Sequence, residues 1–279
     1  MLNAKPSRTA QRVAMRRAAH QLLDDPRVFN DPLAAAIAGE SEPPDSVEQP
    51  FSRALRAFLA VRSRYAEDQL ARAVERGVLR QYVVLGAGLD TFAYRSPFRS
   101  SGLHVFEVDH PATQEWKRAR LDAAHIPVPK EMTFAAVDFE HESLTDGLTA
   151  AGFNRRQPAF FSWLGVTPYL SRAAFDTTMR FIAQMPSGSG VAFDYAVERR
   201  LLSPTQQLAL DAMSARVARA GEPFQLFFDP AALADDLVRL GLANIEDLDS
   251  GQINARYFAE RSDGLAVSGG GHLLSAWVK

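Results

Sequence analysis

The 279-residue chain contains no cysteine. Disulfide bonds, zinc sites built on thiolates and cysteine nucleophiles are therefore excluded. An excess of charge is also missing, because 31 Lys and Arg stand against 33 Asp and Glu and give a formal net charge of −2. This balance argues against a protein whose surface is built to bind nucleic acid. The basic stretch 8–17 could face nucleic acid or a membrane, but we favour a solvent-exposed helix face.

Long apolar runs are lacking as well. No run approaches the roughly 18 residues that a membrane-spanning helix needs, and the first residues lack the apolar segment of a secretory signal. We therefore expect a cytoplasmic protein without a membrane partner. The hydrophobic content of 47% is ordinary for a globular protein, so a chain of this length can bury a large core without a metal or a disulfide.

The N-terminal residues 1–76 have the pattern of helices. Apolar residues recur with helical spacing in 9–23 and again in 51–74. Asp31 followed by Pro32 predicts a short helix that begins at this point, since Asp favours the N-cap position and Pro the first helical position. We expect these helices to form a cap on the rest of the chain.

Downstream, short apolar runs alternate with amphipathic segments. The predicted strands are 82–85, 103–108, 132–136, 159–163, 191–195, 243–248 and 272–278. The predicted helices are 111–124, 141–151, 171–184, 204–219 and 230–240. This alternation predicts an α/β fold with a mostly parallel sheet and helices on both faces, in which the last two strands could be antiparallel. We expect one domain over 1–279, with its core in 77–279 and inserted helices near 196–241.

A glycine turn directly follows the first predicted strand. Gly86 and Gly88 flank Ala87, and glycine lets a turn be tight and lets a ligand approach the backbone. Asp109 ends the second predicted strand, 23 positions after Gly86, where a carboxylate can accept hydrogen bonds from both ribose hydroxyls. Glu107 lies on the same strand face and could take this role instead. The pattern predicts a nucleoside site.

The nucleoside is more consistent with S-adenosylmethionine than with NAD. A dinucleotide site has a third glycine at the position of Thr91 and seats a pyrophosphate on the helix N-terminus. Asp90 would repel that pyrophosphate, whereas S-adenosylmethionine carries an ammonium and a sulfonium cation. Asp90 could favour those charges, or it could cap the following helix.

The chain resembles the leucine carboxyl methyltransferase family, and within it the bacterial branch of S-adenosylmethionine-dependent methyltransferases. The resemblance covers about residues 31–195. It is carried by Arg62-Ser63-Arg64, Leu85 to Thr91, Phe106 to Asp109, Val137-Asp138-Phe139 and Gly165 to Leu170. It implies a class I methyltransferase sheet, which is Rossmann-like, with an added helical cap and S-adenosyl-L-methionine as cofactor.

The resemblance also implies a role for individual residues in cofactor binding. Gly86 is expected beside the methionine part, and Asp109 at the ribose. Asp138 is expected to accept a hydrogen bond from the adenine amine, with Phe139 beside the ring. The full expected set is Arg62, Gly86, Ala87, Gly88, Asp90, Asp109, Asp138, Phe139 and Leu164.

Two of these positions leave alternatives open. Arg62 is the candidate for the cofactor carboxylate, because a guanidinium fork matches a carboxylate, and Arg64 is the alternative. Family members usually have Glu at the position of Leu164, where it is expected to face the methionine ammonium. Asp90 or a backbone carbonyl could replace that contact. Loss of the Glu also admits a protein that binds the cofactor without catalysing transfer.

The methyl acceptor is expected to be a small molecule that offers a carboxylate or a hydroxyl. Tyr169, Asp194 and Tyr195 follow or end predicted strands and are the candidates for lining its pocket. His20 is expected at the surface. No spacing of acidic residues or histidines predicts a metal site, and the chain could be a monomer or a homodimer.

Overall fold

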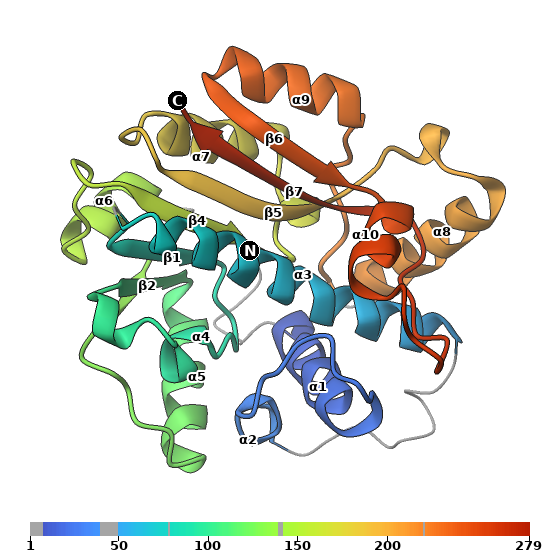
Figure 1. Cartoon of the computed structure of the whole chain (residues 1–279), viewed down its shortest axis with the longest axis horizontal. Helices are drawn as coiled ribbons and strands as arrows, with labels where there is room; N and C mark the ends of the chain where they lie inside the picture. The colour runs from blue at the N-terminus through green and yellow to red at the C-terminus, as the bar shows by residue number, and fades with distance from the viewer. Residues whose placement is uncertain (1–7, 40–49, 78, 139–141, 220) are drawn as a thin grey trace.

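The computed structural model describes residues 8–39, 50–77, 79–138, 142–219 and 221–279. In these residues the strands form one seven-stranded sheet in the order β3-β2-β1-β4-β5-β7-β6 (Figure 1). The strands are β1 Gln81–Leu85, β2 His104–Asp109, β3 Met132–Ala136, β4 Ala159–Trp163, β5 Gly190–Ala196, β6 Leu242–Leu248 and β7 Gly271–Val278. β1 to β5 are parallel, and β7 is antiparallel to both β5 and β6. The predicted mostly parallel sheet is confirmed, and β6 runs in the direction of β1 to β5.

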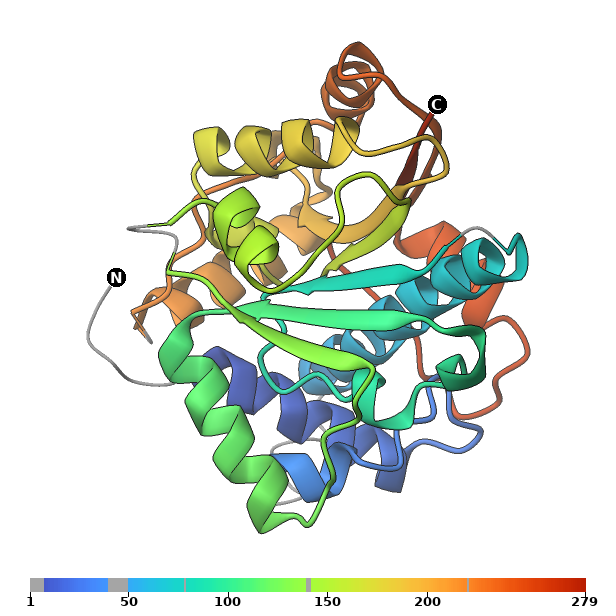
Figure 2. The ribbon, with the colours of Figure 1, turned by 90° about the vertical axis from the view of Figure 1, so that its left-hand side faces the viewer.

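Helices cover both faces of this sheet (Figure 2). They are α1 Arg8–Leu23, α2 Ala34–Ala38, α3 Pro50–Glu75, α4 Phe92–Arg95, α5 Pro111–Ala123, α6 Leu144–Ala150, α7 Arg172–Ala183, α8 Pro204–Arg219, α9 Pro230–Arg239 and α10 Ser250–Tyr257. The described residues also contain the 3-10 turns η2 Arg99–Ser101, η3 Thr167–Tyr169 and η4 Arg199–Leu201.

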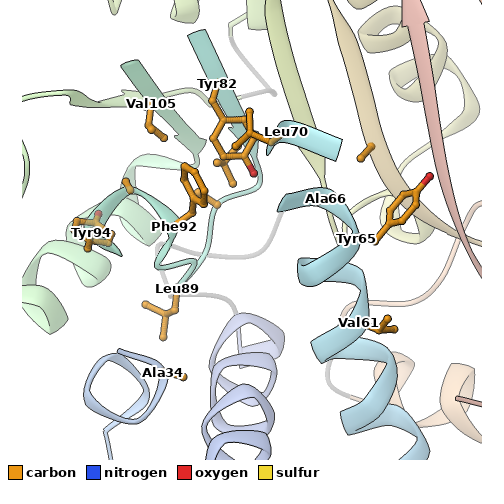
Figure 3. Close-up of a cluster of buried hydrophobic side chains, with 14 of the residues drawn as sticks. Ala34, Val61, Tyr65, Ala66, Leu70, Tyr82, Leu89, Phe92, Tyr94 and Val105 are labelled. Atoms are coloured by element: carbon orange, nitrogen blue, oxygen red, sulfur yellow. The ribbon is translucent and has the colours of Figure 1, made fainter. Parts of the chain in front are cut away.

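The buried side chains form two clusters, one on each face of the sheet. Because strand side chains alternate, Tyr82 and Val84 of β1 join the cluster that includes α1 to α5 and α10, while Val83 and Leu85 join the cluster of α6, α7 and α9. Figure 3 shows the first cluster, in which Leu70 of α3 and Phe92 of α4 meet Tyr82. Both faces of β1 are therefore buried, and the end of the strand is held firmly in place.

The N-terminal helices lie over the turn that follows β1. α1 packs against both α2 and α3, and α2 also contacts α5 (Figure 1). A Cβ built on Gly88 would lie 3.2 Å from the Cβ of Ala10 in α1. The predicted cap therefore approaches the glycine turn itself.

Three expectations about these helices and their side chains are wrong, and one helix was not predicted. α2 begins at Ala34 with Leu33 as its N-cap, so Asp31 lies two residues before the cap; its Oδ1 accepts a hydrogen bond from Leu33 N at 3.2 Å, and its Oδ2 is bound by Arg17. Arg17 is 5% exposed, so the basic stretch is not simply a solvated face. His20 is fully buried between Asp24 and the backbone of Phe29. α10 was not predicted, although Asp249 and Gln252 form a capping box at its start.

Candidate functional site

The glycine turn after β1 adopts a backbone that glycine favours. Gly86 has φ +67° and Gly88 has φ +46°, both in the left-handed region. The amides of Gly86 and Ala87 both donate to the carbonyl of Val108, at 2.9 and 3.0 Å, which ties the turn to β2. A Cβ on Gly86 would lie 2.4 Å from Val166 Cγ2. A side chain at position 86 therefore has neither the backbone geometry nor the space that it needs.

Asp109 lies beside this turn at the carboxyl end of β2. Its Oδ2 accepts a hydrogen bond from Gly88 N at 2.6 Å, and its Oδ1 accepts one from His110 N at 2.7 Å. Burial raises the pKa of Asp109, and these two amides partly offset the effect. The carboxylate is thus fixed in orientation and keeps lone pairs that can accept hydrogen bonds from a ligand.

Glu107 is occupied elsewhere. Its side chain is 1% exposed and lies 2.6 Å from Lys117 Nζ. Tyr94 Oη donates to it at 3.2 Å. Burial raises the pKa of Glu107 to about 7, against the opposing effect of Lys117. Of the two acidic residues considered for the ribose, the geometry favours Asp109.

Asp90 forms hydrogen bonds within the turn that leads into α4. Its Oδ1 accepts a hydrogen bond from Phe92 N at 2.8 Å, at the start of α4. Its backbone amide donates to the carbonyl of Ala87 at 2.7 Å, which closes the turn. Thr91 is the N-cap residue of α4, so these contacts place the carboxylate of Asp90 in the turn before the helix, where it binds the first helical amide.

Asp138 follows β3. It is linked to Asp109 by a backbone hydrogen bond of its neighbour Val137 and by the side chain of His110. Val137 N donates to the carbonyl of Asp109 at 3.0 Å. His110 Nε2 lies 3.9 Å from Asp138 Oδ2, while its Nδ1 accepts from Ala112 N and caps α5. The two aspartates therefore stand at the ends of neighbouring strands. Phe139, the expected neighbour of the adenine ring, lies outside the described residues.

The two arginines that were alternatives lie in different surroundings. Arg62 is 8% exposed, and its Nη1 donates to Asp194 Oδ2 at 3.2 Å. Arg64 has a half-exposed side chain that pairs with Asp68, at 2.7 Å, on the outer side of α3. The geometry favours Arg62 as the cation of the site.

Arg62 lies directly against the loop that follows β4. A Cβ on Gly165 would be 2.6 Å from Arg62 Nη2. The amide of Gly165 donates to Asp194 Oδ1 at 2.5 Å, and the hydroxyl of Thr167 donates to the carbonyl of Asp194 at 2.6 Å. Leu164 is half-buried and packs on the core cluster that includes α3. The loop 164–167, the end of β5 and α3 thus meet at Arg62.

The two tyrosines proposed for the acceptor pocket differ. Tyr169 is half-buried and packs against Phe224, with ring centroids 5.2 Å apart and ring planes tilted by 58°. Burial raises its pKa to about 12, although the charge of Arg62 opposes this rise. Tyr195 points to the opposite face of the sheet from Asp194, where its hydroxyl donates to Asp247 Oδ2 at 2.6 Å. Tyr169 is close to Arg62, while Tyr195 contributes to packing on the other face.

A buried network that the sequence did not predict fastens the cap to the turn. Arg17 pairs with Asp31 and donates to the carbonyl of Leu89 at 3.3 Å. Thr91 donates to Asp31 Oδ2 at 2.7 Å, and Arg95 donates to Glu67 of α3. The residues that pair in this network are far apart in the sequence. The only sequence signal for these contacts was the presence of polar residues within otherwise apolar helices.

The described residues contain no group of three or more His, Asp or Glu side chains placed to hold a metal ion. Within the same ranges, no helix has both the length and the apolar character that crossing a bilayer requires.

Comparison with known proteins places this arrangement in a family. The model of the leucine carboxyl methyltransferase family matches residues 10–183. The "Putative S-adenosyl-L-methionine-dependent methyltransferase YktD" of Bacillus subtilis is 31% identical over 95% of this chain and 96% of its own length. A protein of the same description from Saccharopolyspora erythraea is 32% identical over 67% of this chain and 66% of its own.

Solved structures agree at the level of the fold. A putative methyltransferase from Thermobifida fusca superposes with a TM-score of 0.62 at 17% identity, covering 99% of this chain and 96% of its own. A DUF574 family protein from Streptomyces avermitilis gives a TM-score of 0.57 at 16% identity, with 95% and 97% covered. The expected class I methyltransferase fold is confirmed. The chain belongs to the leucine carboxyl methyltransferase family.

Proposed function

We propose that this chain transfers the methyl group of S-adenosyl-L-methionine to an oxygen of a small molecule, either a carboxylate or a hydroxyl. The observation that carries the proposal is the cradle at the carboxyl ends of β1 and β2. There Asp109, held by Gly88 N, stands beside a turn in which Gly86 has a left-handed φ and no room for a side chain. A carboxylate at this position can accept hydrogen bonds from the ribose hydroxyls, and glycine allows a ligand to approach the backbone closely.

The residues present fit this cofactor. Asp109 would hold the ribose hydroxyls, and Asp138 at the end of the next strand would accept from the adenine amine. Arg62, buried against Gly165, would bind the carboxylate of the methionine part. A pyrophosphate would instead meet the carboxylate of Asp90 at the start of α4, which disfavours a dinucleotide. The charges of the site therefore suit a sulfonium compound without phosphate.

The protein has to position the acceptor. When bound, S-adenosylmethionine supplies an activated methyl group. Holding the acceptor oxygen in line with that group can contribute roughly 7–11 kcal/mol through proximity and orientation. Tyr169 is protonated at neutral pH, because its pKa is raised to about 12. Its hydroxyl can therefore donate a hydrogen bond to the acceptor, and it does not serve as a general base at that pH.

Titration and label transfer test the proposal. Wild-type protein should bind S-adenosylmethionine and S-adenosylhomocysteine saturably, and it should move label from methyl-labelled cofactor into the small-molecule fraction of a cell extract. Alkali then separates the acceptors, because a methyl ester is hydrolysed and a methyl ether is not. Binding without transfer would indicate a non-catalytic protein, and label in the protein fraction would point to a protein acceptor.

A further inference from the structure

Arg62 and Asp194 form a buried pair of opposite charges whose hydrogen-bonding capacity is incompletely used. The side chains are 9% and 6% exposed, and Arg62 Nη1 lies 3.2 Å from Asp194 Oδ2. A guanidinium carries five N–H donors, and in the described residues Arg62 uses one of them, on Asp194. Asp194 accepts that bond and one from Gly165 N, which leaves lone pairs on both oxygens.

The position of this pair is fixed from several sides. Gly165 N and the hydroxyl of Thr167 bind the side chain and the carbonyl of Asp194. The guanidinium of Arg62 lies against Gly165, where a Cβ would be 2.6 Å from Nη2. A cation and an anion are thus held next to each other at the loop that follows β4. An α-amino acid presents the complementary arrangement, with a carboxylate and an ammonium on one carbon.

We propose that Arg62 and Asp194 act together as the clamp for the amino-acid part of S-adenosylmethionine, with Arg62 on the carboxylate and Asp194 on the ammonium. This inference rests on the proposed function. It assigns Asp194 to cofactor binding, whereas the sequence had suggested a place in the acceptor pocket. Charge-assisted hydrogen bonds are strong where water is excluded. Each buried charge of the protein would face an opposite charge of the ligand, which offsets the cost of removing both from water.

Nearby carboxylates are engaged in other contacts. Asp90 accepts a hydrogen bond from Phe92 N at the start of α4. Glu67 binds Arg95 in the network that fastens the cap. Glu222 accepts a hydrogen bond from Thr9 of α1. Among the carboxylates of the described residues, Asp194 contacts both Arg62 and the loop beside Leu164, so it is placed to face an ammonium there.

A purely structural pair would behave differently from a clamp. If Arg62 and Asp194 only fastened α3 to β5, neutralising Asp194 would loosen the site and weaken every adenosyl ligand alike. A clamp is selective, because it discriminates ligands by the amino group that they carry.

Isothermal titration with three ligands separates the two cases. S-adenosylhomocysteine has both charged groups, its deaminated analogue 5′-S-(3-carboxypropyl)-5′-thioadenosine has only the carboxylate, and methylthioadenosine has neither. Asp194→Asn should lower the affinity for S-adenosylhomocysteine by about 10- to 100-fold and should change the affinities for the other two ligands little. Arg62→Gln should lower the affinities for S-adenosylhomocysteine and its deaminated analogue and leave the affinity for methylthioadenosine unchanged. Asp247→Asn, at the end of β6, is the matched control and should change none.

Equal weakening of all three ligands by Asp194→Asn, or no change for S-adenosylhomocysteine, would overturn the clamp. Wild-type protein alone also tests the clamp, which matters if the variants fail to fold. It must bind S-adenosylhomocysteine at least tenfold more tightly than the deaminated analogue. Equal affinities would contradict the proposal. Absence of any saturable binding to wild type would instead remove the proposed function itself.

Discussion

Gly88 and Asp109 are joined by a hydrogen bond of 2.6 Å from the backbone amide to Oδ2. The contact links the turn after β1 to the end of β2 across 21 positions of sequence. It fixes a carboxylate beside a turn whose two glycines have left-handed backbone conformations, with φ +67° and +46°. The geometry of this cradle depends on glycine at two positions and on one aspartate.

Gly86→Ala should abolish cofactor binding or weaken it more than tenfold. The left-handed backbone at φ +67° costs a residue with a side chain about 1–2 kcal/mol, and the new Cβ would lie 2.4 Å from Val166. Gly77→Ala is the control, because Gly77 has φ +81° and open space around it. That variant should lose about 1 kcal/mol of stability with unchanged affinity for S-adenosylhomocysteine. Similar binding defects in both variants would show that strain, and not the cradle, decides affinity.

Arg64→Gln should leave the affinity for S-adenosylhomocysteine unchanged, whereas Arg62→Gln should lower it by roughly 1.5–3 kcal/mol. The reason is placement: Arg62 is buried at Gly165, and Arg64 pairs with Asp68 on the outer side of α3. Titration calorimetry on the two variants gives the answer. A defect confined to Arg64→Gln would reverse the assignment.

Asp24 should govern part of the acid stability of the cap. Burial alone would raise its pKa, but hydrogen bonds from Arg56 and His20 outweigh this and lower it to about 2. A lowered pKa stabilises the fold above the unfolded value near 4, and the contribution, about 2 kcal/mol, is lost as pH falls toward 2. Urea unfolding between pH 5 and 2 should show this loss in wild type and not in Asp24→Asn. Parallel pH curves for the two proteins would contradict the assignment.

The pair of Glu107 and Lys117 should show strong coupling. Both side chains are 1% exposed and 2.6 Å apart. Lys117→Met leaves a buried carboxylate without its cation and should cost about 3–5 kcal/mol of unfolding free energy. The double variant Glu107→Gln/Lys117→Met should recover most of that loss. The single variant should also lose stability as pH rises, because its remaining acid must ionise without a partner. Additive effects in urea unfolding would exclude the coupling.

The elements that the sequence predicted were those with local signals. The strands, the glycine turn and Asp109 follow from apolar runs and short-range spacing, and the described strands match the predicted ones within a residue or two. Tyr195 could have been separated from Asp194 in advance, since neighbouring residues in a strand face opposite sides. The capping box of Asp249 and Gln252 was a local signal for α10 that went unused.

Contacts between distant segments could not be predicted in this way. Arg62 meets Asp194 across 132 positions, and Arg17 reaches Leu89 across 72. Neither pair leaves a spacing pattern, because the sheet order and the path of α3 bring the partners together. The burial of Arg17 and the pairing of Arg62 became visible only from the fold.

Titration of S-adenosylhomocysteine into wild type and Asp109→Asn tests the central claim most directly. The carboxylate beside Gly88 should accept the ribose hydroxyls, so wild type should bind one equivalent saturably. The variant should bind more weakly by roughly 1–3 kcal/mol, with an unchanged thermal unfolding midpoint. No saturable heat from wild type, or equal affinity in the two proteins, would contradict the account.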